Sequence, residues 1–225
     1  MTRGGPRDPV PRFGDRRRTR IGLLGGSFNP AHAGHRHIAL IARRRLRLHQ
    51  IWLLVSPQNP LKSASGMGLF YERLRSAQAI ADGRRIVATG IEAALGTRFT
   101  ADTVRKLRRR FSRVRFVWLI GADNLRQLAE WRQWTQITRD ATLAVLPRPG
   151  YNYAALRGAA AIRLAHARRP ARQAPILASR PAPAWTFIPA AQHSASATAI
   201  RQEAKEHSHR QKPVTARAAR RLAAD

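Results

Sequence analysis

The sequence predicts an α/β fold: a single Rossmann-like, doubly wound parallel sheet with helices on both of its faces. Two observations lead to this prediction. Six short apolar runs, each ended by glycine or proline, alternate with longer stretches whose composition suits helices. Strands separated by helices of this length are typical of βαβ units, which build parallel sheets.

The expected strands come first in each unit and occupy residues 20–26, 51–57, 85–90, 114–121, 142–148 and 185–190. The expected helices lie between them, over residues 34–47, 68–82, 100–110, 125–135 and 152–168. A stretch rich in Pro, Arg and Ala, residues 167–185, is expected to be a surface excursion before the last strand. Ligands of such sheets bind at the carboxyl ends of the strands, so the segments that follow the strands are the candidate functional positions.

The chain has 225 residues, of which 44% are hydrophobic, enough for one domain with a buried core. We expect a basic, mobile segment over residues 1–17, a folded domain over residues 18–203 and a basic tail over residues 204–225. Cysteine is absent, which excludes disulfides and a Cys nucleophile and suits a reducing compartment. The chain start does not resemble a signal peptide and no stretch is long and apolar enough to span a bilayer, so we expect a cytoplasmic protein without a membrane partner.

The formal net charge of +30 has two interpretations. A basic surface attracts nucleic acid, anionic lipid or anionic metabolites. Alternatively, the excess of Arg over Lys, together with abundant Ala and Pro, reflects a compositional bias spread over every segment. We favour the second interpretation and expect no specific nucleic-acid partner, because the Arg clusters are not interleaved with the aromatic residues on which bases stack.

The segment after the first expected strand reads GGSFNPAHAGHRHIAL, residues 25–40. The paired glycines let backbone N–H groups approach a ligand closely, and a helix follows whose first turn is expected to hold His32 and His35 on one face. A helix N-terminus already favours an anion, so this arrangement indicates a polyphosphate site. The alternatives are a zinc pair and two unrelated surface histidines. Zinc needs a third protein ligand, and the nearby His37 lies off that face. Unrelated surface histidines would not need glycines and a proline in register with them.

The run GGSFNPAHAGH resembles the Gly-Gly-x-Phe-x-Pro-x-His-x-Gly-His motif of the nucleotidyltransferase superfamily, and within it the bacterial nicotinate mononucleotide adenylyltransferases. The resemblance implies that the 18–203 domain is a nucleotidyltransferase domain and that its first motif binds ATP. It assigns ATP contacts to Gly25, Gly26, Ser27, Phe28, His32, Gly34 and His35, with His32 and His35 also catalytic. Asn29 stands where many relatives carry Asp, which weakens the case for a protein carboxylate there.

Two further segments are similar to motifs of the same family. The run VSPQNPLK, residues 55–62, resembles its Pro-x-x-Pro-x-Lys segment and implies a phosphate contact by Lys62. In the run GTRFTADTVRKL, residues 96–107, Thr100 or Asp102 suits a helix cap, and capping is the alternative to a binding role. The family's Tyr-Thr stretch, with Phe99 here in place of Tyr, implies that Thr100 contacts the pyridine nucleotide.

The run LIGADNLRQLAEWRQW, residues 119–134, resembles the family's Gly-Ala-Asp and Trp-x-x-Trp motif. The resemblance places Gly121 and Asp123 at ATP, and Ala122 and Trp131 at the acceptor substrate, with Trp131 against the nicotinate ring. An indole face attracts a pyridinium, although an apolar stripe at helical spacing is more often core, as expected for Trp134.

The run SASATAIRQ, residues 194–202, is similar to the family's Ile-Ser-Ser-Thr-x-Ile-Arg signature, with Ala195 and Ala197 replacing the Ile and the middle Ser. It implies ATP contacts by Ser196, Thr198 and Arg201, with Arg201 also catalytic. Capping of the closing helix is the alternative role for Ser196.

The implied reaction is adenylyl transfer from ATP to nicotinate mononucleotide in NAD biosynthesis, with Mg²⁺ carried by the ATP and no metal site formed by the protein. ATP and nicotinate mononucleotide are therefore the expected partners. Two alternatives stay open: transfer to another phosphate acceptor, such as nicotinamide mononucleotide or pantetheine phosphate, and a basic nucleic-acid-binding protein built on the same scaffold.

Overall fold

The computed structural model describes residues 8–57, 66–191, 195, 197–198 and 200–202. Its centre is a seven-stranded sheet in the order β3-β2-β1-β4-β5-β7-β6, and all of its strand pairs are parallel. The strands are β1 Arg20–Gly26, β2 Gln50–Val55, β3 Ile86–Thr89, β4 Arg115–Gly121, β5 Thr142–Leu146, β6 Arg168–Arg169 and β7 Trp185–Phe187. The six strands expected from the sequence are all present, and the two-residue edge strand β6 is an addition.

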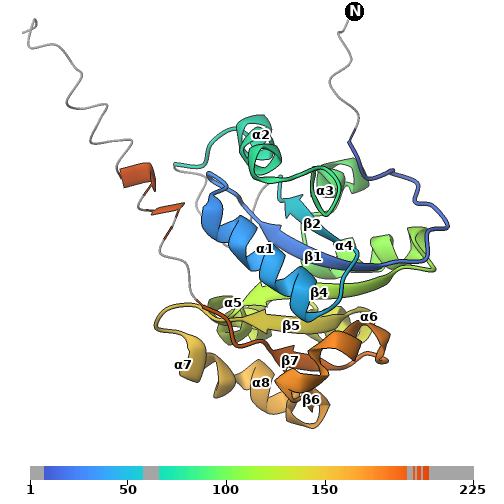
Figure 1. Cartoon of the computed structure of the whole chain (residues 1–225), viewed down its shortest axis with the longest axis vertical. Coiled ribbons are helices and arrows are strands. Elements are labelled where there is room, and N and C mark those ends of the chain that lie inside the picture. The colour runs from blue at the N-terminus through green and yellow to red at the C-terminus, as the bar shows by residue number, and fades with distance from the viewer. Residues whose placement is uncertain (1–7, 58–65, 192–194, 196, 199, 203–225) are drawn as a thin grey trace, which may run out of the picture.

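Helices cover both faces of the sheet (Figure 1). One face is covered by α1 Ala33–Arg45, α2 Phe70–Ile80 and the 3-10 helix η3 Ala171–Ser179. The other is covered by α3 Ile91–Leu95, α4 Thr100–Arg110, α5 Ala122–Gln127, α6 Trp134–Asp140, α7 Asn152–Leu156 and α8 Ala159–Arg163, with the short 3-10 turns η1 Leu128–Glu130 and η2 Ala165–Ala167. The predicted doubly wound parallel fold is confirmed. Among the described residues, no helix is both long and apolar enough to cross a membrane.

The apolar runs of the sequence become strands that are buried on both sides. In β1, Leu23 faces one core cluster and Leu24 the other, and in β2 Trp52 and Leu53 divide in the same way. This alternation explains why the strands read as continuous apolar runs instead of alternating with polar residues.

The direction in which successive strands are added to the sheet reverses between β1 and β4. From β1 the chain moves outward through β2 and β3, and then returns to β4 on the other side of β1. The carboxyl ends of these two neighbouring strands form the switch point at which doubly wound sheets bind their ligands. The first motif follows β1 at Gly26, and the Gly-Ala-Asp motif begins as β4 ends at Gly121, so both lie at this point.

Three of the expected elements differ from the structure. The single helix expected over residues 125–135 is broken, because Gln133 adopts a left-handed φ of 52° and α6 starts after it. The helix expected over residues 152–168 is divided into α7, α8 and η2. The excursion expected over residues 167–185 instead holds β6 and η3, and Leu177 of η3 is buried in the core because it closes one face of the sheet.

The described part of the N-terminal segment, which was expected to be mobile, packs against the domain. Val10 is only 2% exposed and belongs to a core cluster. The Asp8 carboxylate accepts hydrogen bonds from the Thr89 hydroxyl and the Gly90 N–H at the end of β3. An apolar residue and an acidic residue anchor this part of the basic segment, a role that composition alone did not indicate.

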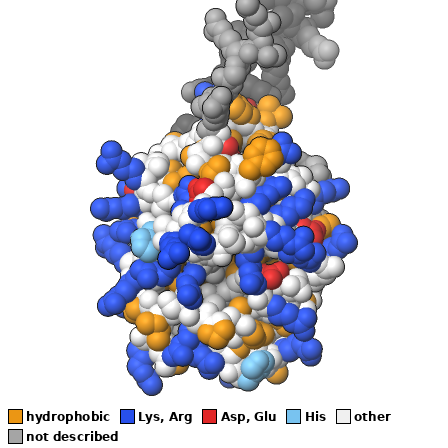
Figure 2. Space-filling model, turned by 90° about the vertical axis from the view of Figure 1, so that its right-hand side faces the viewer, with side chains coloured by type: hydrophobic (Ala, Val, Ile, Leu, Met, Phe, Trp, Pro, Cys, Tyr) orange, Lys and Arg blue, Asp and Glu red, His pale blue; other side chains and the backbone are white. Residues whose placement is uncertain are grey.

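The face of the molecule shown in Figure 2 is rich in Lys and Arg side chains. Figure 2 views the molecule from the side on which the strands of Figure 1 start, and basic side chains cover that face with a few acidic ones between them.

Candidate active site

His32 ends the loop that follows β1 and is the N-cap of α1, with extended backbone angles of φ −148° and ψ 172°. It therefore stands just outside the helix, which begins at Ala33, and not within the first turn as expected. Its Nδ1 accepts the Gly34 N–H at 3.1 Å, and Nδ1 of His35 accepts the N–H of His32 at 3.2 Å. Two imidazoles thus take the place of the Ser and Glu side chains that usually form such a reciprocal cap.

The capping bonds decide which nitrogen of each ring carries hydrogen. Because Nδ1 accepts from a backbone amide in both rings, the neutral form of each imidazole carries its proton on Nε2. The two ring centroids are 3.9 Å apart, and the buried Phe28 ring lies 4.9 Å from His35. The histidines therefore form a compact, oriented pair of N–H donors at a helix N-terminus.

Position 34 needs a glycine because the neighbouring atoms leave no room for a side chain. A Cβ at this position would lie 2.9 Å from the His32 ring and 3.2 Å from the carbonyl oxygen of Ala195. The segment that contains Ala195 therefore crosses the start of α1, although 161 positions separate the two residues in the sequence.

Arg201 is joined to the same loop. Its Nη1 donates a hydrogen bond of 2.6 Å to the carbonyl oxygen of Asn29, and its Nη2 donates to the Thr198 hydroxyl at 3.3 Å. The Asn29 side chain binds the next loop, accepting the Gly68 N–H and donating to the Gly66 carbonyl. A carboxylate at position 29 would repel that carbonyl, so the amide suits this connection.

Arg73 of α2 holds this edge of the sheet together and was missed at the level of sequence. It is 3% exposed, and its guanidinium donates hydrogen bonds of 2.7–2.9 Å to four carbonyl oxygens, those of Ser27, Ser56, Pro57 and Gly68. Burial lowers the pKa of Arg73. The sequence did contain a signal for this role. Arg73 lies one helical turn before Ala77 on the apolar face of α2, and a charged side chain on such a face needs a specific partner.

At the end of β4, Asp123 lies beside Arg148, which follows β5. Their side chains form an ion pair of 3.7 Å between Oδ1 and Nε, and a Cβ at Gly121 would collide with the same carboxylate oxygen. Among the described residues, neither of the two paired atoms has a hydrogen-bond partner. Arg148 is a second residue that sequence reasoning missed, although the run LPRPGY places it directly after a strand.

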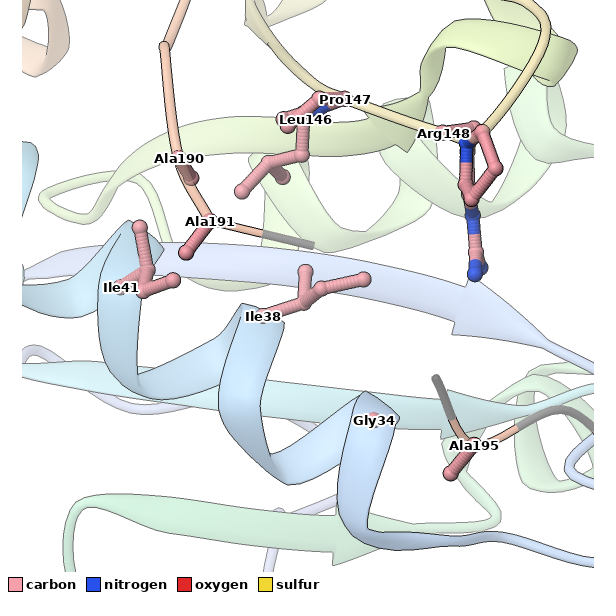
Figure 3. Close-up of a pocket in the computed structure, with 10 residues that line it drawn as sticks. Gly34, Ile38, Ile41, Leu146, Pro147, Arg148, Ala190, Ala191 and Ala195 are labelled. Atoms are coloured by element: carbon pink, nitrogen blue, oxygen red, sulfur yellow. The ribbon is translucent and has the colours of Figure 1, made fainter. Parts of the chain in front are cut away.

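A narrow crevice lies beside the histidine loop (Figure 3). It is mostly apolar and is lined by Gly34, Ile38 and Ile41 of α1, by Leu146 at the end of β5 and residues 147–149 after it, and by Ala190, Ala191 and Ala195. Its volume is about 20 Å³, room for roughly one water molecule. A flat heterocycle would enter only if α1 and the opposite segments moved apart.

Thr100 and Trp131 lie on segments that meet in space. The Arg132 guanidinium lies 4.7 Å from the centre of the Phe99 ring, so the residue before Thr100 contacts the residue after Trp131. Thr100 is the first residue of α4, and the N-cap is Phe99 without a side-chain bond, so the expected cap by Thr100 or Asp102 is wrong. Trp131 packs against the core, and its buried Nε1 has no hydrogen-bond partner among the described residues.

A buried carboxyl group supports the start of α4. Glu92 is 8% exposed, and its Oε1 accepts the Thr103 hydroxyl at 3.0 Å, while the same hydroxyl lies 2.9 Å from Thr97 Oγ1. Burial raises the pKa of Glu92 to about 7. This network ties α3 to the segment that leads into Thr100.

Lys62 and Ser196 lie outside the described residues. The remaining predicted positions fall into two groups at the carboxyl edge of the sheet. The first group contains the histidine pair, Gly34 and Arg201, and the crevice and Arg148 connect it to Asp123. The second group contains Thr100 and Trp131.

Comparison with known proteins identifies the family of this chain. Residues 23–203 match the cytidylyltransferase-like family model. A probable nicotinate-nucleotide adenylyltransferase of Gluconobacter oxydans is 60% identical over 183 residues, which cover 81% of this chain and 94% of the relative. One of the same name from Gluconacetobacter diazotrophicus is 55% identical over 206 residues, covering 89% and 96%.

Solved structures share the fold. The nicotinic acid mononucleotide adenylyltransferase of Plasmodium falciparum, complexed with APC, superposes with a TM-score of 0.57 at 14% identity, covering 82% of this chain and 83% of that one. The same protein complexed with NaAD gives a TM-score of 0.56. The chain therefore belongs to the cytidylyltransferase-like family and, within it, to the bacterial nicotinate-nucleotide adenylyltransferases.

Proposed function

We propose that the protein is a cytoplasmic enzyme of NAD biosynthesis that transfers the adenylyl group of ATP to nicotinate mononucleotide, giving nicotinate adenine dinucleotide and pyrophosphate. One structural observation supports the proposal independently of the names of the relatives. Two motifs that lie more than 150 residues apart are joined at a single helix N-terminus through Gly34, Ala195, Asn29 and Arg201. That position concentrates N–H donors and positive charge where a triphosphate needs both.

The reaction needs alignment more than proton transfer. An oxygen of the 5′-phosphate of the mononucleotide forms a bond to the α-phosphorus of ATP, and the bond from that phosphorus to the oxygen bridging to the β-phosphorus breaks. The electron pair of the broken bond leaves with pyrophosphate. Because a phosphate monoester has a second pKa of about 6, the nucleophile is already mostly dianionic at neutral pH and no general base is required.

The barrier comes from bringing two anions together and from the charge that builds on the leaving group. We assign its neutralisation to the Nε2–H groups of His32 and His35 and to the Arg201 guanidinium. Backbone N–H groups from Gly25 to Phe28, at the end of β1 and the start of the loop after it, complete the contacts to ATP together with Ser196 and Thr198.

Arg148 extends the phosphate contacts that the family motifs imply. The adenosine lies between Gly121, Asp123 and the apolar crevice in this proposal, and the crevice opens to admit the base. Arg148 lines that crevice and is paired with Asp123 at 3.7 Å, longer than a hydrogen bond. It is therefore able to turn toward an entering phosphate.

The acceptor site lies beside the ATP site. We assign the nicotinate ring to the Trp131 face, and the rest of the mononucleotide to Lys62, Thr100 and Ala122. The contact between Phe99 and Arg132 supports a common pocket for these segments.

Magnesium enters as part of the substrate MgATP. The described residues include no cluster of three or more His, Asp or Glu side chains able to hold a metal ion. Mg²⁺ keeps several of its waters when it is bound mainly by phosphates, so an ion that arrives with the triphosphate needs few protein ligands.

The test is a coupled pyrophosphate-release assay with each of three acceptors: nicotinate mononucleotide, nicotinamide mononucleotide and pantetheine phosphate. We expect the highest kcat/KM with nicotinate mononucleotide and formation of the dinucleotide in equal amount to pyrophosphate. A higher kcat/KM with either other acceptor would contradict the proposed substrate. Absence of release with all three, together with salt-dependent RNA binding, would favour the nucleic-acid-binding alternative.

A further inference from the structure

A basic cavity lies at the opposite edge of the sheet from the histidine loop. It is formed where β1 and β4 begin and has a volume of about 360 Å³, within the range of small-ligand sites. Seven residues line it: Arg18, Thr19, Arg20, His49, Arg113, Arg115 and Ser179. Four of the seven are arginines, and none is acidic. We propose that this cavity is a binding site for a small polyphosphate, separate from the catalytic site.

The register of the sheet concentrates the positive charge. Arg20 of β1 and Arg115 of β4 are direct partners across neighbouring parallel strands, and Arg115 N–H also bonds the Thr19 carbonyl. Arg18 and Arg113 each precede one of these partners by two positions. Like charges placed opposite one another on neighbouring strands repel, so the arrangement costs stability until an anion occupies it.

The charge of this cluster is not neutralised within the described part of the chain. There, none of the four guanidinium groups forms an ion pair with a carboxylate. A second arginine-lined cavity differs in this respect: it contains Arg105, Arg108 and Arg109, and Arg108 is paired with Asp140 at 3.0 Å. The lack of a carboxylate partner among the described residues therefore distinguishes the proposed site from the other arginine-rich cavity.

Several groups of the cavity are already held in place. Arg20 Nε donates to the Arg47 carbonyl at 3.0 Å, and Arg115 Nη1 donates to the Ser179 carbonyl at 3.2 Å. His49 Nδ1 accepts the Arg20 N–H, which leaves the proton of the neutral ring on Nε2. Fixed guanidinium groups lose less conformational entropy when they bind an anion.

The chemistry of the lining favours a compact polyphosphate over RNA. Four permanent cations balance about four negative charges, as on a triphosphate at neutral pH, and arginine forks fit phosphate oxygens bidentately. Among the described residues, no Phe, Tyr or Trp lines the cavity, so it lacks the large aromatic faces on which the bases of a single strand stack best.

The experiment is calorimetric titration with inorganic tripolyphosphate. The catalytic site also attracts a triphosphate, so the wild-type isotherm is expected to contain two binding events. In the double variant Arg18→Gln/Arg113→Gln, one event is expected to weaken at least about tenfold. The kcat should stay at the wild-type value, and the melting temperature should not fall, because fewer like charges then repel one another. The matched control, Arg108→Gln/Arg109→Gln, removes the same charge from the other cavity and is expected to keep both events.

Three outcomes would overturn the proposal. They are an unchanged isotherm in the Arg18/Arg113 variant, an equal weakening in both double variants, and loss of binding of a single-stranded RNA oligomer in the Arg18/Arg113 variant without any loss of tripolyphosphate binding. Binding is measured without the acceptor, so failure of adenylyl transfer would refute the proposed function and leave this test intact.

Discussion

The Gly34 N–H donates to Nδ1 of His32, and the same glycine lies so close to the His32 ring that a Cβ would approach it to 2.9 Å. One residue therefore both orients the imidazole and makes room for it. The absence of a side chain at position 34 is thus as much a part of the site as the histidine.

Replacing Gly34 by Ala is expected to lower kcat/KM by about a hundredfold, because a displacement of the His32 ring by a fraction of an ångström misaligns its Nε2–H. Steady-state kinetics measures the loss. In a double-mutant cycle, the same substitution in a His32→Ala background should cost much less, since the group it displaces is already gone. Equal losses in the two backgrounds would mean that Gly34 acts through the Ala195 segment alone.

Removing the Trp131 ring is expected to raise the KM for nicotinate mononucleotide by about tenfold and to leave the KM for ATP nearly unchanged, because the indole face attracts the pyridinium. The matched control is Trp134→Ala, which removes a neighbouring ring that packs against the core. That control should lower the melting temperature without a selective effect on the acceptor. A parallel rise of both KM values in Trp131→Ala would contradict the assignment.

Arg73→Lys is expected to lower the free energy of unfolding by roughly 2–3 kcal/mol, because an ammonium group cannot reach all four carbonyl oxygens that the guanidinium binds. The KM for ATP should rise as well, since three of those carbonyls, of Ser27, Ser56 and Pro57, directly follow β1 and β2. Arg75→Lys on the same helix is the control, and it should change stability by less than about 0.5 kcal/mol. Thermal and urea unfolding measure both variants, and an equal effect of the two would refute the role of Arg73.

The raised pKa of Glu92, about 7 against 4.5 in an exposed carboxyl, makes stability depend on pH. Below pH 4.5 both states are protonated and the group contributes nothing. Between pH 4.5 and 7 the unfolded state releases the proton while the folded state keeps it, so stability falls as the pH rises, and above pH 7 the full cost is present.

Glu92→Gln removes this cost while an oxygen remains to accept the Thr103 hydroxyl. The variant should therefore melt at a higher temperature than the wild type at pH 8, and the difference should vanish near pH 4.5. A constant difference across this range would show that Glu92 does not titrate on folding.

The sequence predicted the parallel sheet because its strands are apolar runs punctuated by glycine and proline, and these are local signals. The orientation of the side chains was harder to predict from the sequence. Nothing in residues 25–40 indicated that His32 would cap the helix through its ring, because imidazole caps depend on the angle at which the loop enters the helix. The break at Gln133 was missed for a related reason: a left-handed φ at a residue other than glycine is imposed by tertiary packing.

Arg73 and Arg148 were missed because their partners lie on other loops. Arg73 binds carbonyl oxygens of two connections, those between β1 and α1 and between β2 and α2, and backbone carbonyls carry no sequence signature. In a chain with 42 Lys and Arg residues, one buried arginine is also difficult to distinguish from its exposed neighbours.

The most direct test of the whole account is to replace His35 by Ala and measure the transfer rate and ATP affinity separately. If His35 acts on charge that develops as pyrophosphate leaves, single-turnover kcat should fall by about 10²–10³-fold, while the dissociation constant of ATP changes by less than about threefold. Equal losses in rate and affinity, or no loss in either, would contradict a site that stabilises the transition state through positioned charge.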